Sequence, residues 1–543
     1  MIASIRIENQ RGFIHKEQKP KTEKRGEYMK TEKQGKKVVT ENKKPGIAQR
    51  FLNGVEKVGN KLPDPFILFA GLAVLVIIVS AIFSAFGATV VHPGSGEELE
   101  VKNLASGEGL NFILTSMLDN FTGFAPLGLV LSMMLGIGLA EKVGMLDYAI
   151  KKTILKSPPA LITYTVVFVG IMGNIASDAA MVLVPPLAAM VFYKIGRNPI
   201  AGLAAGYASA GAGFTANLLI AGTDALLAGI STEAAKIIDE NMVVTPIDNW
   251  YFNIVSVFVL TIVGGLVTTK FIEPRLGEYK GEEVKEAIKE DPPNAGKALR
   301  NAAIAGFAYI ALIAGAILIP NSPLTNEDGG LVPSPFLDGI IPIILFFFII
   351  IGTVYGVTVG NIKSSKDVAN FMAEAMKDLA SYIVLIFAIA QFIAYFSWSN
   401  IATWVAVNGA EFLKDVEFTG IGLIIGYIIF TASLNFLITS GSAKWALEAP
   451  VFVPMFMQLG YHPAFTQVAY RVADSSTNIV TPMMPYMVIA LSFMQKYDKK
   501  AGIGTFISLM LPYSITFLIT WIIMLLVFVF FGIPFGPGIG PYL

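Results

Sequence analysis

The 543-residue chain contains no cysteine, only three histidines and few charged residues. The absence of cysteine excludes disulfides, cysteine-ligated zinc and thiolate catalysis. The histidines, His15, His92 and His462, are too scattered to form a metal site. Charged residues make up 15% of the chain, whereas roughly 25% is usual in a soluble domain. We therefore expect no cofactor, and we expect most of the chain to lie in lipid.

Long apolar runs dominate the sequence, in which 54% of the residues are hydrophobic and the mean hydropathy is +0.62. A helix needs roughly 20 apolar residues to cross about 30 Å of hydrocarbon. Nine runs are long enough or nearly so: 66–86, 124–141, 199–230, 248–269, 301–319, 336–356, 379–397, 464–490 and 503–531. Two longer stretches, 158–193 and 418–459, are interrupted midway by small and polar residues. The sequence predicts an all-α polytopic membrane protein with about nine transmembrane helices and two re-entrant hairpins.

Basic residues indicate which helix ends face the cytoplasm. Residues 1–50 hold 14 Lys or Arg against 6 Glu, 270–300 hold seven Lys or Arg, and 320–335 hold none. Basic residues flank both ends of 158–193, so this hairpin is expected to open to the cytoplasm. The alternation then places the opening of 418–459 on the outside, with the N-terminus cytoplasmic and the C-terminus external.

These patterns divide the chain into three parts. We expect a basic cytoplasmic arm that is mostly disordered (1–60), a membrane domain (61–535) and a short external tail (536–543). The arm has the charge of a nucleic-acid-binding segment as well. A lysine-rich leader before a membrane helix requires no such partner, so we expect no nucleic acid.

A weak internal repeat relates the two halves of the membrane domain. A shift of 264 residues aligns five identical pairs: Pro186 with Pro450, Phe192 with Phe456, Gly196 with Gly460, Pro199 with Pro463, and Ala205 with Ala469. The two hairpins open to opposite sides, which makes the repeat an inverted one. Inverted repeats with interrupted helices are typical of secondary transporters, whose substrate site lies near the bilayer midplane.

Polar residues mark the first hairpin tip at 173–178, Gly-Asn-Ile-Ala-Ser-Asp. The glycine permits a turn, Asn174 and Ser177 supply neutral oxygens, and Asp178 falls where a helix N-terminus accepts an anion. Simple capping of the second arm is the alternative reading of Ser177 and Asp178. Non-helical backbone at membrane depth must face protein or a water-filled cavity, and this favours a binding role.

The run 199–230 is rich in glycine and serine and also contains Asn217 and Asp224. Close helix packing explains the small residues. It does not explain Asp224, because an ionisable residue inside a span is costly and is usually functional. We therefore predict that Asp224 carries a coupling ion or proton.

The second hairpin is expected to turn at Ser440-Gly441-Ser442, which resembles the first tip in residue type. Trp445 is suited to simple packing or to stacking on a flat substrate. Lys444 and Glu448 are four residues apart and are expected to pair with each other if both are helical.

The most polar segment within an apolar run is 470–482, which includes Arg471, Asp474 and Asn478 and ends at Pro482. Arg471 and Asp474 share a helical face, and a structural ion pair between them is one interpretation. The many hydroxyl and amide groups exceed what one pair requires. Because arginine binds carboxylates bidentately, the alternative interpretation is a site for an organic anion.

These segments, together with 120–128 and 391–400, resemble the p-aminobenzoyl-glutamate transporter (AbgT) family over residues 60 to 535. The motifs at 440–445, 449–455 and 470–482 match in order and spacing. The resemblance implies a dimeric, bowl-shaped protein of the bacterial inner membrane that belongs to the ion-transporter superfamily. It further implies functional residues at Asp224, Ser442, Trp445, Pro463, Arg471, Asp474 and Pro482, and substrates such as p-aminobenzoyl-glutamate or p-aminobenzoate-like compounds.

The sequence thus predicts an ion-coupled transporter, working by uptake or efflux, with a homodimeric assembly in lipid. The predicted substrate-binding residues are Asn174, Ser177, Asn217, Asn400, Ser440, Ser442, Trp445, Pro463, Arg471, Asn478 and Pro482. The predicted coupling residues for H⁺ or Na⁺ are Asp178, Asp224 and Asp474, and a sodium ion near the hairpin tips would have unknown ligands.

Three other functions compete with this prediction. A transporter of another organic anion, such as a dicarboxylate, would use the same fold. A membrane-embedded enzyme would need a nucleophile with a base or a metal-ligand motif, and neither is evident in the sequence. A passive channel would have little use for two inverted hairpins.

Overall fold

The computed structural model of the protein describes residues 63–93, 96–176, 179–281, 291–331 and 334–543. The predicted basic arm, 1–60, lies outside these ranges, as do the predicted site residues Ser177 and Asp178. The described part is almost entirely helical, which confirms the all-α prediction. A short antiparallel pair of strands, β1 (Thr89–Val91) and β2 (Glu98–Glu100), connects the first two helices.

The first half of the chain folds into ten α-helices and two short irregular turns within the described ranges. They are α2 (Pro65–Ala85), α3 (Gly107–Thr122), α4 (Ala125–Lys142), α5 (Met145–Leu155), α6 (Ile162–Met172), η1 (Gly173–Ala176), α7 (Ala179–Lys194), α8 (Pro199–Ala212), α9 (Gly222–Ala235), α10 (Trp250–Val267), η2 (Thr268–Ile272) and α11 (Glu273–Leu276).

The second half continues with helices only. They are α12 (Ala295–Ile317), α13 (Pro335–Asp338), α14 (Ile340–Val359), α15 (Ser365–Asp378), α16 (Ala380–Trp398), α17 (Ile401–Asp415), α18 (Gly420–Leu434), α19 (Gly441–Gln458), α20 (Pro463–Thr477), α21 (Pro485–Tyr497) and α22 (Ile503–Phe531).

Seven helical segments in the described ranges are long and apolar enough to cross a membrane. They are Pro65–Ala85, Gly107–Lys142, Trp250–Leu276, Ala295–Ile317, Ile340–Val359, Ala380–Trp398 and Ile503–Phe531. The predicted runs 199–230 and 464–490 are not single helices, because each is interrupted by a polar segment, between α8 and α9 and between α20 and α21. The predicted number of crossings therefore stays a prediction.

Each predicted hairpin is a helix–break–helix unit. Helices α6 and α7 pack on each other around the turn η1. Helices α18 and α19 are joined by hydrogen bonds from Tyr427 and Thr431 on α18 to Glu448 on α19. The structure thus has both pairs of arms, and their return to the same membrane face stays a prediction.

The local geometry repeats at the predicted spacing of 264 residues. Gly196 and Gly460 both have the left-handed backbone that favours glycine, with φ of 76° and 86°. Two residues later, Asn198 caps α8 and His462 caps α20, and each accepts a hydrogen bond from the backbone N–H two residues further on. A proline then begins each helix. This shared turn between hairpin and interrupted helix supports a structural repeat.

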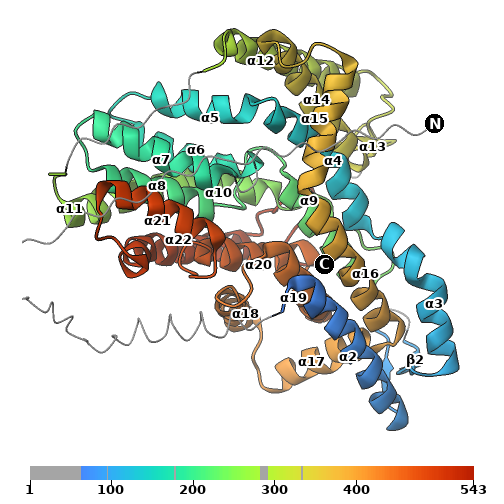
Figure 1. Ribbon diagram of the computed structural model, residues 1–543. Coiled ribbons are helices and arrows are strands. Elements are labelled where there is room, and N and C mark those ends of the chain that lie inside the picture. Colours follow the sequence, from blue (N-terminus) through green and yellow to red (C-terminus); the bar gives the residue numbers. More distant parts are fainter. Residues whose placement is uncertain (1–62, 94–95, 177–178, 282–290, 332–333) are drawn as a thin grey trace, which may run out of the picture. The chain divides into compact units, whose positions relative to one another are not determined.

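The helices form two packed groups. Helices α4, α12, α14 and α15, here called the scaffold helices, pack on one another and lie at the top and upper right of Figure 1. Helices α6–α9 and α18–α21, here called the hairpin helices, form most of the larger hydrophobic core. The groups meet where α4 crosses α9. A Cβ at Gly229 would lie 2.9 Å from Pro126, so only glycine permits this approach.

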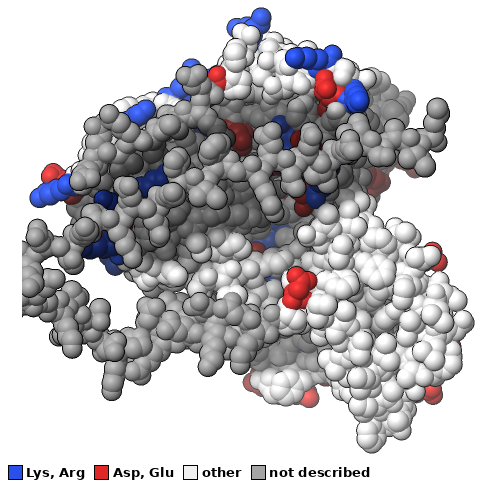
Figure 2. Space-filling model, in the orientation of Figure 1, with Lys and Arg blue, Asp and Glu red and all other residues white. Residues whose placement is uncertain are grey.

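Charges are distributed unevenly over the visible surface (Figure 2). Lys and Arg gather along the upper and left edges of that view, whereas the surface over α2, α3 and α16 at the lower right carries few charges. Large apolar side chains such as Leu114 and Leu118 on α3 are exposed. An exposed apolar face of this extent suits contact with lipid or with another membrane protein.

Helices α3, α5, α15 and α17 were not predicted from the sequence. Each contains charged residues, and none is a sufficiently long and apolar run by itself. Helix α3 continues almost directly into α4, so the two form one 36-residue segment.

Candidate functional site

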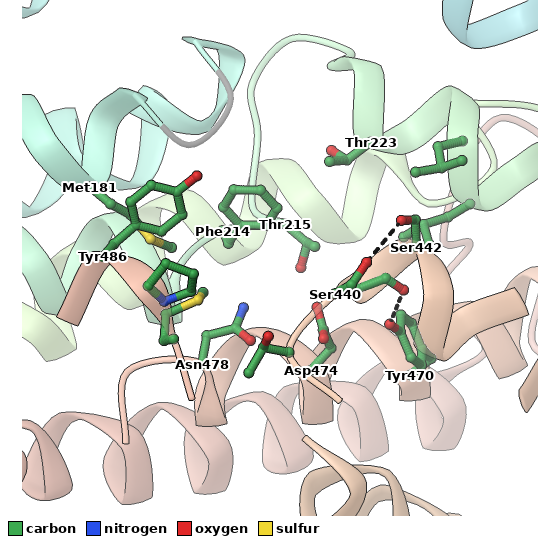
Figure 3. A pocket seen from close by; sticks show the side chains of 16 residues that line it. Met181, Phe214, Thr215, Thr223, Ser440, Ser442, Tyr470, Asp474, Asn478 and Tyr486 are labelled. Atoms are coloured by element: carbon green, nitrogen blue, oxygen red, sulfur yellow. Dashed lines mark hydrogen bonds between the residues drawn. The ribbon is translucent and has the colours of Figure 1, made fainter. Parts of the chain in front are cut away.

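A cavity of about 350 Å³ lies where the two hairpins meet the two interrupted helices (Figure 3). Its volume is at the lower end of the roughly 300–1,000 Å³ that is usual for small-molecule sites. The lining comes from α7, from the α8–α9 break and α9, from the α18–α19 tip, from α20, and from the α20–α21 break and the start of α21. The residues are Met181, Phe214, Thr215, Thr223, Leu226, Leu227, Thr439, Ser440, Gly441, Ser442, Tyr470, Asp474, Asn478, Met484, Pro485 and Tyr486.

Three helices begin at this cavity: α9, α19 and α21. Each starts at or beside a residue of the cavity lining, namely Thr223, Gly441 and Pro485. The first turns of a helix present free N–H groups and a positive partial charge. The cavity is therefore suited to an anion even though Asp474 lies on its wall.

The second hairpin tip is held by its own hydroxyl groups and by Tyr470. Ser440 caps α19, its Oγ accepting a hydrogen bond from the N–H of Ala443 at 3.4 Å. Its hydroxyl also lies 3.2 Å from that of Ser442, and the Tyr470 hydroxyl donates to the Gly441 carbonyl oxygen at 2.5 Å, as the dashed lines in Figure 3 show. These contacts position the predicted residues Ser440 and Ser442 at the cavity.

Two buried ion pairs connect segments that are far apart in the sequence. Lys444 Nζ on α19 lies 2.7 Å from Asp474 Oδ1 on α20. Arg471 Nη1 on α20 lies 2.8 Å from Asp224 Oδ1 on α9. All four side chains are nearly inaccessible to solvent. The pairs therefore join the second hairpin and the first interrupted helix to α20.

These pairings differ from those considered from the sequence. Lys444 pairs with Asp474 and not with Glu448, and Arg471 pairs with Asp224 and not with its neighbour Asp474. The reason is the crossing of the helices, which brings the partners from other elements closer than residues on the same helix. Asp224 also accepts a hydrogen bond from the Ala221 N–H at 2.7 Å, so it caps α9.

The two interrupted helices are joined next to the cavity. The hydroxyl of Thr215, in the break after α8, lies 2.7 Å from that of Ser475 on α20. The side-chain amide nitrogen of Asn435, at the end of α18, lies within hydrogen-bond distance of the Asp474 carbonyl oxygen, the Thr477 hydroxyl and the Asn478 side-chain oxygen, and can donate to two of them at a time. The second hairpin is thereby fastened to the end of α20 that lines the cavity.

Trp445 lies behind the cavity wall. Its side chain is fully buried, its Nε1 donates to the Leu227 carbonyl oxygen at 3.1 Å and to Ser231 at 3.2 Å, and its ring centre is 4.6 Å from that of Tyr470. In this conformation it packs the start of α19 against α9, and its ring contacts Tyr470, which belongs to the cavity lining.

Arg471 is likewise behind the wall, since it is buried and does not belong to the lining. In this conformation its guanidinium is paired with Asp224 and is not presented to a substrate. Its predicted role in binding a carboxylate therefore requires either a rearrangement or an indirect effect on the cavity.

The remaining predicted residues fall into two sets. Asn174 donates to the Ala216 carbonyl oxygen, and Asn217 and Pro482 lie in the two breaks, but none of the three belongs to the cavity lining. Asn217 is fully buried, and both polar atoms of its side chain lack a hydrogen-bond partner.

Asn400 and Pro463 lie elsewhere. Asn400 donates to the Glu100 carbonyl oxygen beside the strand pair, and Pro463 begins α20 two turns before the cavity lining. The structure does not bring them to the cavity.

Several lining residues were not singled out from the sequence. Tyr470 and Thr215 are polar residues within two of the segments that were singled out, 470–482 and 199–230, and their position in interrupted helices is the signal that points to them. Phe214, Met484 and Tyr486 give no such signal, because apolar and aromatic residues occur throughout a membrane domain.

No cluster of three or more His, Asp or Glu side chains that suits a metal ion occurs in the part of the chain that the structure describes. Hydroxyl, amide and carbonyl oxygens also bind sodium, and the predicted sodium site near the tips stays a prediction without assigned ligands.

Comparison with known proteins identifies the family. Residues 50–543 match the family model described as the AbgT putative transporter family. Over 490 residues the chain is 44% identical to the p-aminobenzoyl-glutamate transport protein of Escherichia coli (strain K12), which covers 90% of this chain and 96% of that protein.

Two solved structures are similar over almost the same length. The YdaH transporter of Alcanivorax borkumensis is 40% identical and superposes with a TM-score of 0.83, covering 88% of this chain and all of that one. MtrF of Neisseria gonorrhoeae, described with a class of antimetabolite efflux pumps, is 43% identical with a TM-score of 0.84, covering 90% of this chain and all of that one. On this evidence the chain belongs to the AbgT family of multi-pass membrane transporters.

Proposed function

We propose that this protein transports p-aminobenzoyl-glutamate or a related p-aminobenzoate-like aromatic carboxylate, and that a proton or sodium gradient drives it. The observation that carries the proposal is the cavity at which α9, α19 and α21 begin. Helix N-termini at an interrupted-helix site attract the carboxylates of organic anions. The name of the Escherichia coli relative supports p-aminobenzoyl-glutamate as the specific substrate.

The rest of the lining suits the two parts of such a molecule. Phe214, Tyr486 and the methionines Met181 and Met484 offer a flat and adaptable surface to an aromatic ring. The hydroxyls of Thr215, Ser440 and Ser442 and the amide of Asn478 offer hydrogen bonds to amide and carboxylate groups. In this proposal the ring lies toward α7 and α21, and the glutamate carboxylates lie toward the tip of the second hairpin.

Coupling is assigned to the buried carboxylates. Asp474 is on the cavity wall and Asp224 is held by Arg471 directly behind it. Uptake of a proton by Asp224 would release Arg471 from its pair, and the guanidinium would then be available to a substrate carboxylate. This sequence of events gives Arg471 its predicted role although it does not reach the cavity in this conformation.

The hairpin helices are proposed to move against the scaffold helices during alternating access. We assign the basic edge of the membrane domain to the cytoplasm of a bacterium, with the N-terminus inside and the C-terminus outside. A homodimer formed through the scaffold helices, surrounded by lipid, is consistent with the exposed apolar residues Ile304, Phe307 and Ile310 on α12.

The test is transport by purified protein in liposomes. Radiolabelled p-aminobenzoyl-glutamate and p-aminobenzoate are supplied under an imposed proton gradient, under a sodium gradient and under both, with loading from either side. We expect movement against the concentration gradient that stops when an ionophore collapses the driving gradient. Protein-free liposomes are the control. If neither compound moves under any gradient, the proposed substrate class is wrong, and dicarboxylates become the next compounds to test.

A further inference from the structure

Besides Asp224 and Asp474, the hairpin and interrupted helices bury a third carboxylate, Glu448, which belongs to neither ion pair. It lies between the arms of the second hairpin, and its residue is 2% exposed. Its Oε2 accepts hydrogen bonds from the hydroxyls of Tyr427 at 2.9 Å and Thr431 at 2.5 Å, both on α18. Its Oε1 is buried and has no hydrogen-bond partner. Two hydroxyl groups thus donate hydrogen bonds to one carboxylate oxygen, and the other oxygen accepts none.

Charge balance distinguishes Glu448 from the buried acids Asp224 and Asp474. Among the described residues of the helices, five charged side chains are buried: Asp224, Lys444, Glu448, Arg471 and Asp474. Arg471 compensates Asp224, and Lys444 compensates Asp474. An ionised Glu448 would leave one negative charge without a partner. Burying an uncompensated ion costs several kcal/mol even after relaxation, and binding a proton avoids that cost.

The groups that face Glu448 offer one route for its charge to be compensated. Tyr427 faces it from α18, Tyr470 and Asp474 face it from α20, and Lys444 precedes it by one turn on α19. Lys444 is the only cation of the four. Residues four apart on a helix lie on the same face, so a rotation of the Lys444 side chain alone moves its ammonium from Asp474 toward Glu448.

We propose that Glu448 holds a proton in this conformation and exchanges it with the cavity through Lys444 and Asp474. This inference rests on the proposed function and names the path of the coupling proton. In the transfer, the Lys444 ammonium gives a proton to Asp474 and recovers one from Glu448. Before the transfer, Glu448 is protonated and Lys444 is paired with Asp474. After the transfer, Asp474 is protonated and Lys444 is paired with Glu448. The net charge is unchanged, and the proton leaves from the residue that lines the cavity.

Two measurements on Glu448→Gln test the proposal. Glutamine keeps the shape and the neutral hydrogen bonding of a protonated glutamate and removes the titratable group. Proton movement accompanying substrate movement is followed in liposomes with an enclosed pH-sensitive dye. We expect Glu448→Gln to keep the wild-type melting temperature and to lose substrate-linked proton movement. Glu411→Gln, on the exposed surface of α17, is the matched control and should move protons as the wild type does.

The second measurement is independent of the substrate. Infrared spectra of purified wild type at neutral pH should contain a C=O band of a buried protonated carboxyl group that Glu448→Gln lacks and Glu411→Gln retains. Absence of that difference, or wild-type proton movement by Glu448→Gln, overturns the proposal. If the wild type moves no aromatic carboxylate, the proposed function fails, and the infrared comparison still decides whether Glu448 carries a proton.

Discussion

At the residue scale, two buried ion pairs join separate elements around the cavity. Asp224 and Arg471 are 247 positions apart, yet their charged atoms are 2.8 Å apart. A buried pair of this kind contributes little net stability, but removal of one partner leaves the other uncompensated. The pair therefore acts mainly to fix α20 against α9 in one arrangement.

Substitution of Arg471 tests this interpretation. Arg471→Ala should lower the free energy of unfolding by about 3–5 kcal/mol, because Asp224 is left buried without a counter-charge. The double variant Arg471→Met with Asp224→Asn should recover most of that loss and should still fail to transport. The stability of the single and double variants is measured by thermal unfolding in detergent, and their transport is measured in liposomes. Equal destabilisation in the single and double variants would show that charge is not the cause.

Tyr470 is expected to act on binding as well as on stability. Tyr470→Phe removes the hydrogen bond to the Gly441 carbonyl oxygen and loosens the hairpin tip, which should cost about 1 kcal/mol and weaken substrate binding roughly fivefold. Tyr382→Phe is the matched control, since it loses a hydrogen bond to the Pro126 carbonyl oxygen away from the cavity. A similar loss of affinity in both variants would contradict a specific role for Tyr470.

Asp248, in the segment before α10, makes stability depend on pH. Burial raises the pKa of Asp248 from 3.8 to about 6, despite hydrogen bonds from Thr245. Because the folded-state pKa is the higher one, ionisation penalises the folded state above about pH 6, and the penalty disappears as the pH falls through that value toward 4. The full difference corresponds to about 3 kcal/mol.

Comparison of the wild type with Asp248→Asn isolates this effect. Between pH 7 and pH 5 the wild type should gain about 1 kcal/mol of stability relative to the variant, and the rest of the full difference should follow as the pH falls below 4. If the stability of the two proteins changes with pH in the same way, Asp248 has an ordinary pKa.

At the element scale, the hairpin arms and the interrupted helices pack through small residues. A Cβ at Gly202 on α8 would lie 2.5 Å from the Ala188 carbonyl oxygen on α7. The backbones of the two helices approach this closely because the residue has no side chain. The first hairpin and the first interrupted helix are thereby held as one packed unit.

Gly202→Ala should separate α7 from α8 and cost about 1–3 kcal/mol, as overpacking usually does. Gly128→Ala is the control, because a Cβ at Gly128 would meet nothing within 4 Å. The substitution also lowers the entropy that the helix backbone loses on folding. It should be neutral or slightly stabilising. The stabilities of the two variants are compared by thermal unfolding. If Gly202→Ala is as stable as the wild type, the contact between α7 and α8 adapts without strain.

The interrupted helices illustrate what the sequence reveals and what it does not. Polar residues such as Ser440, Asp474 and Asn478 could be assigned to the site because they are costly in an apolar run unless they face a cavity. Their partners could not be assigned, because the contact of Thr215 with Ser475 depends on how two distant helices cross. Amphipathic helices such as α17 were missed because their charges interrupt the apolar signal.

At the scale of the whole molecule, one cavity receives residues from both halves of the repeat. The first half supplies α7 and the α8–α9 break, and the second half supplies the α18–α19 tip and α20 with its break. A movement of either hairpin relative to the scaffold helices therefore changes the cavity itself. This arrangement agrees with the proposed mechanism, in which alternating access moves the hairpin helices against the scaffold helices.

Equilibrium binding of radiolabelled p-aminobenzoyl-glutamate to the purified protein tests this account most directly. Ser442→Leu places a bulky apolar group on the cavity wall and should weaken binding at least about tenfold, equivalent to about 1.4 kcal/mol. Ser492→Leu, on the exposed side of α21, should bind as the wild type does. Wild-type affinity in both variants would show that the substrate binds elsewhere and would contradict the assignment of this cavity.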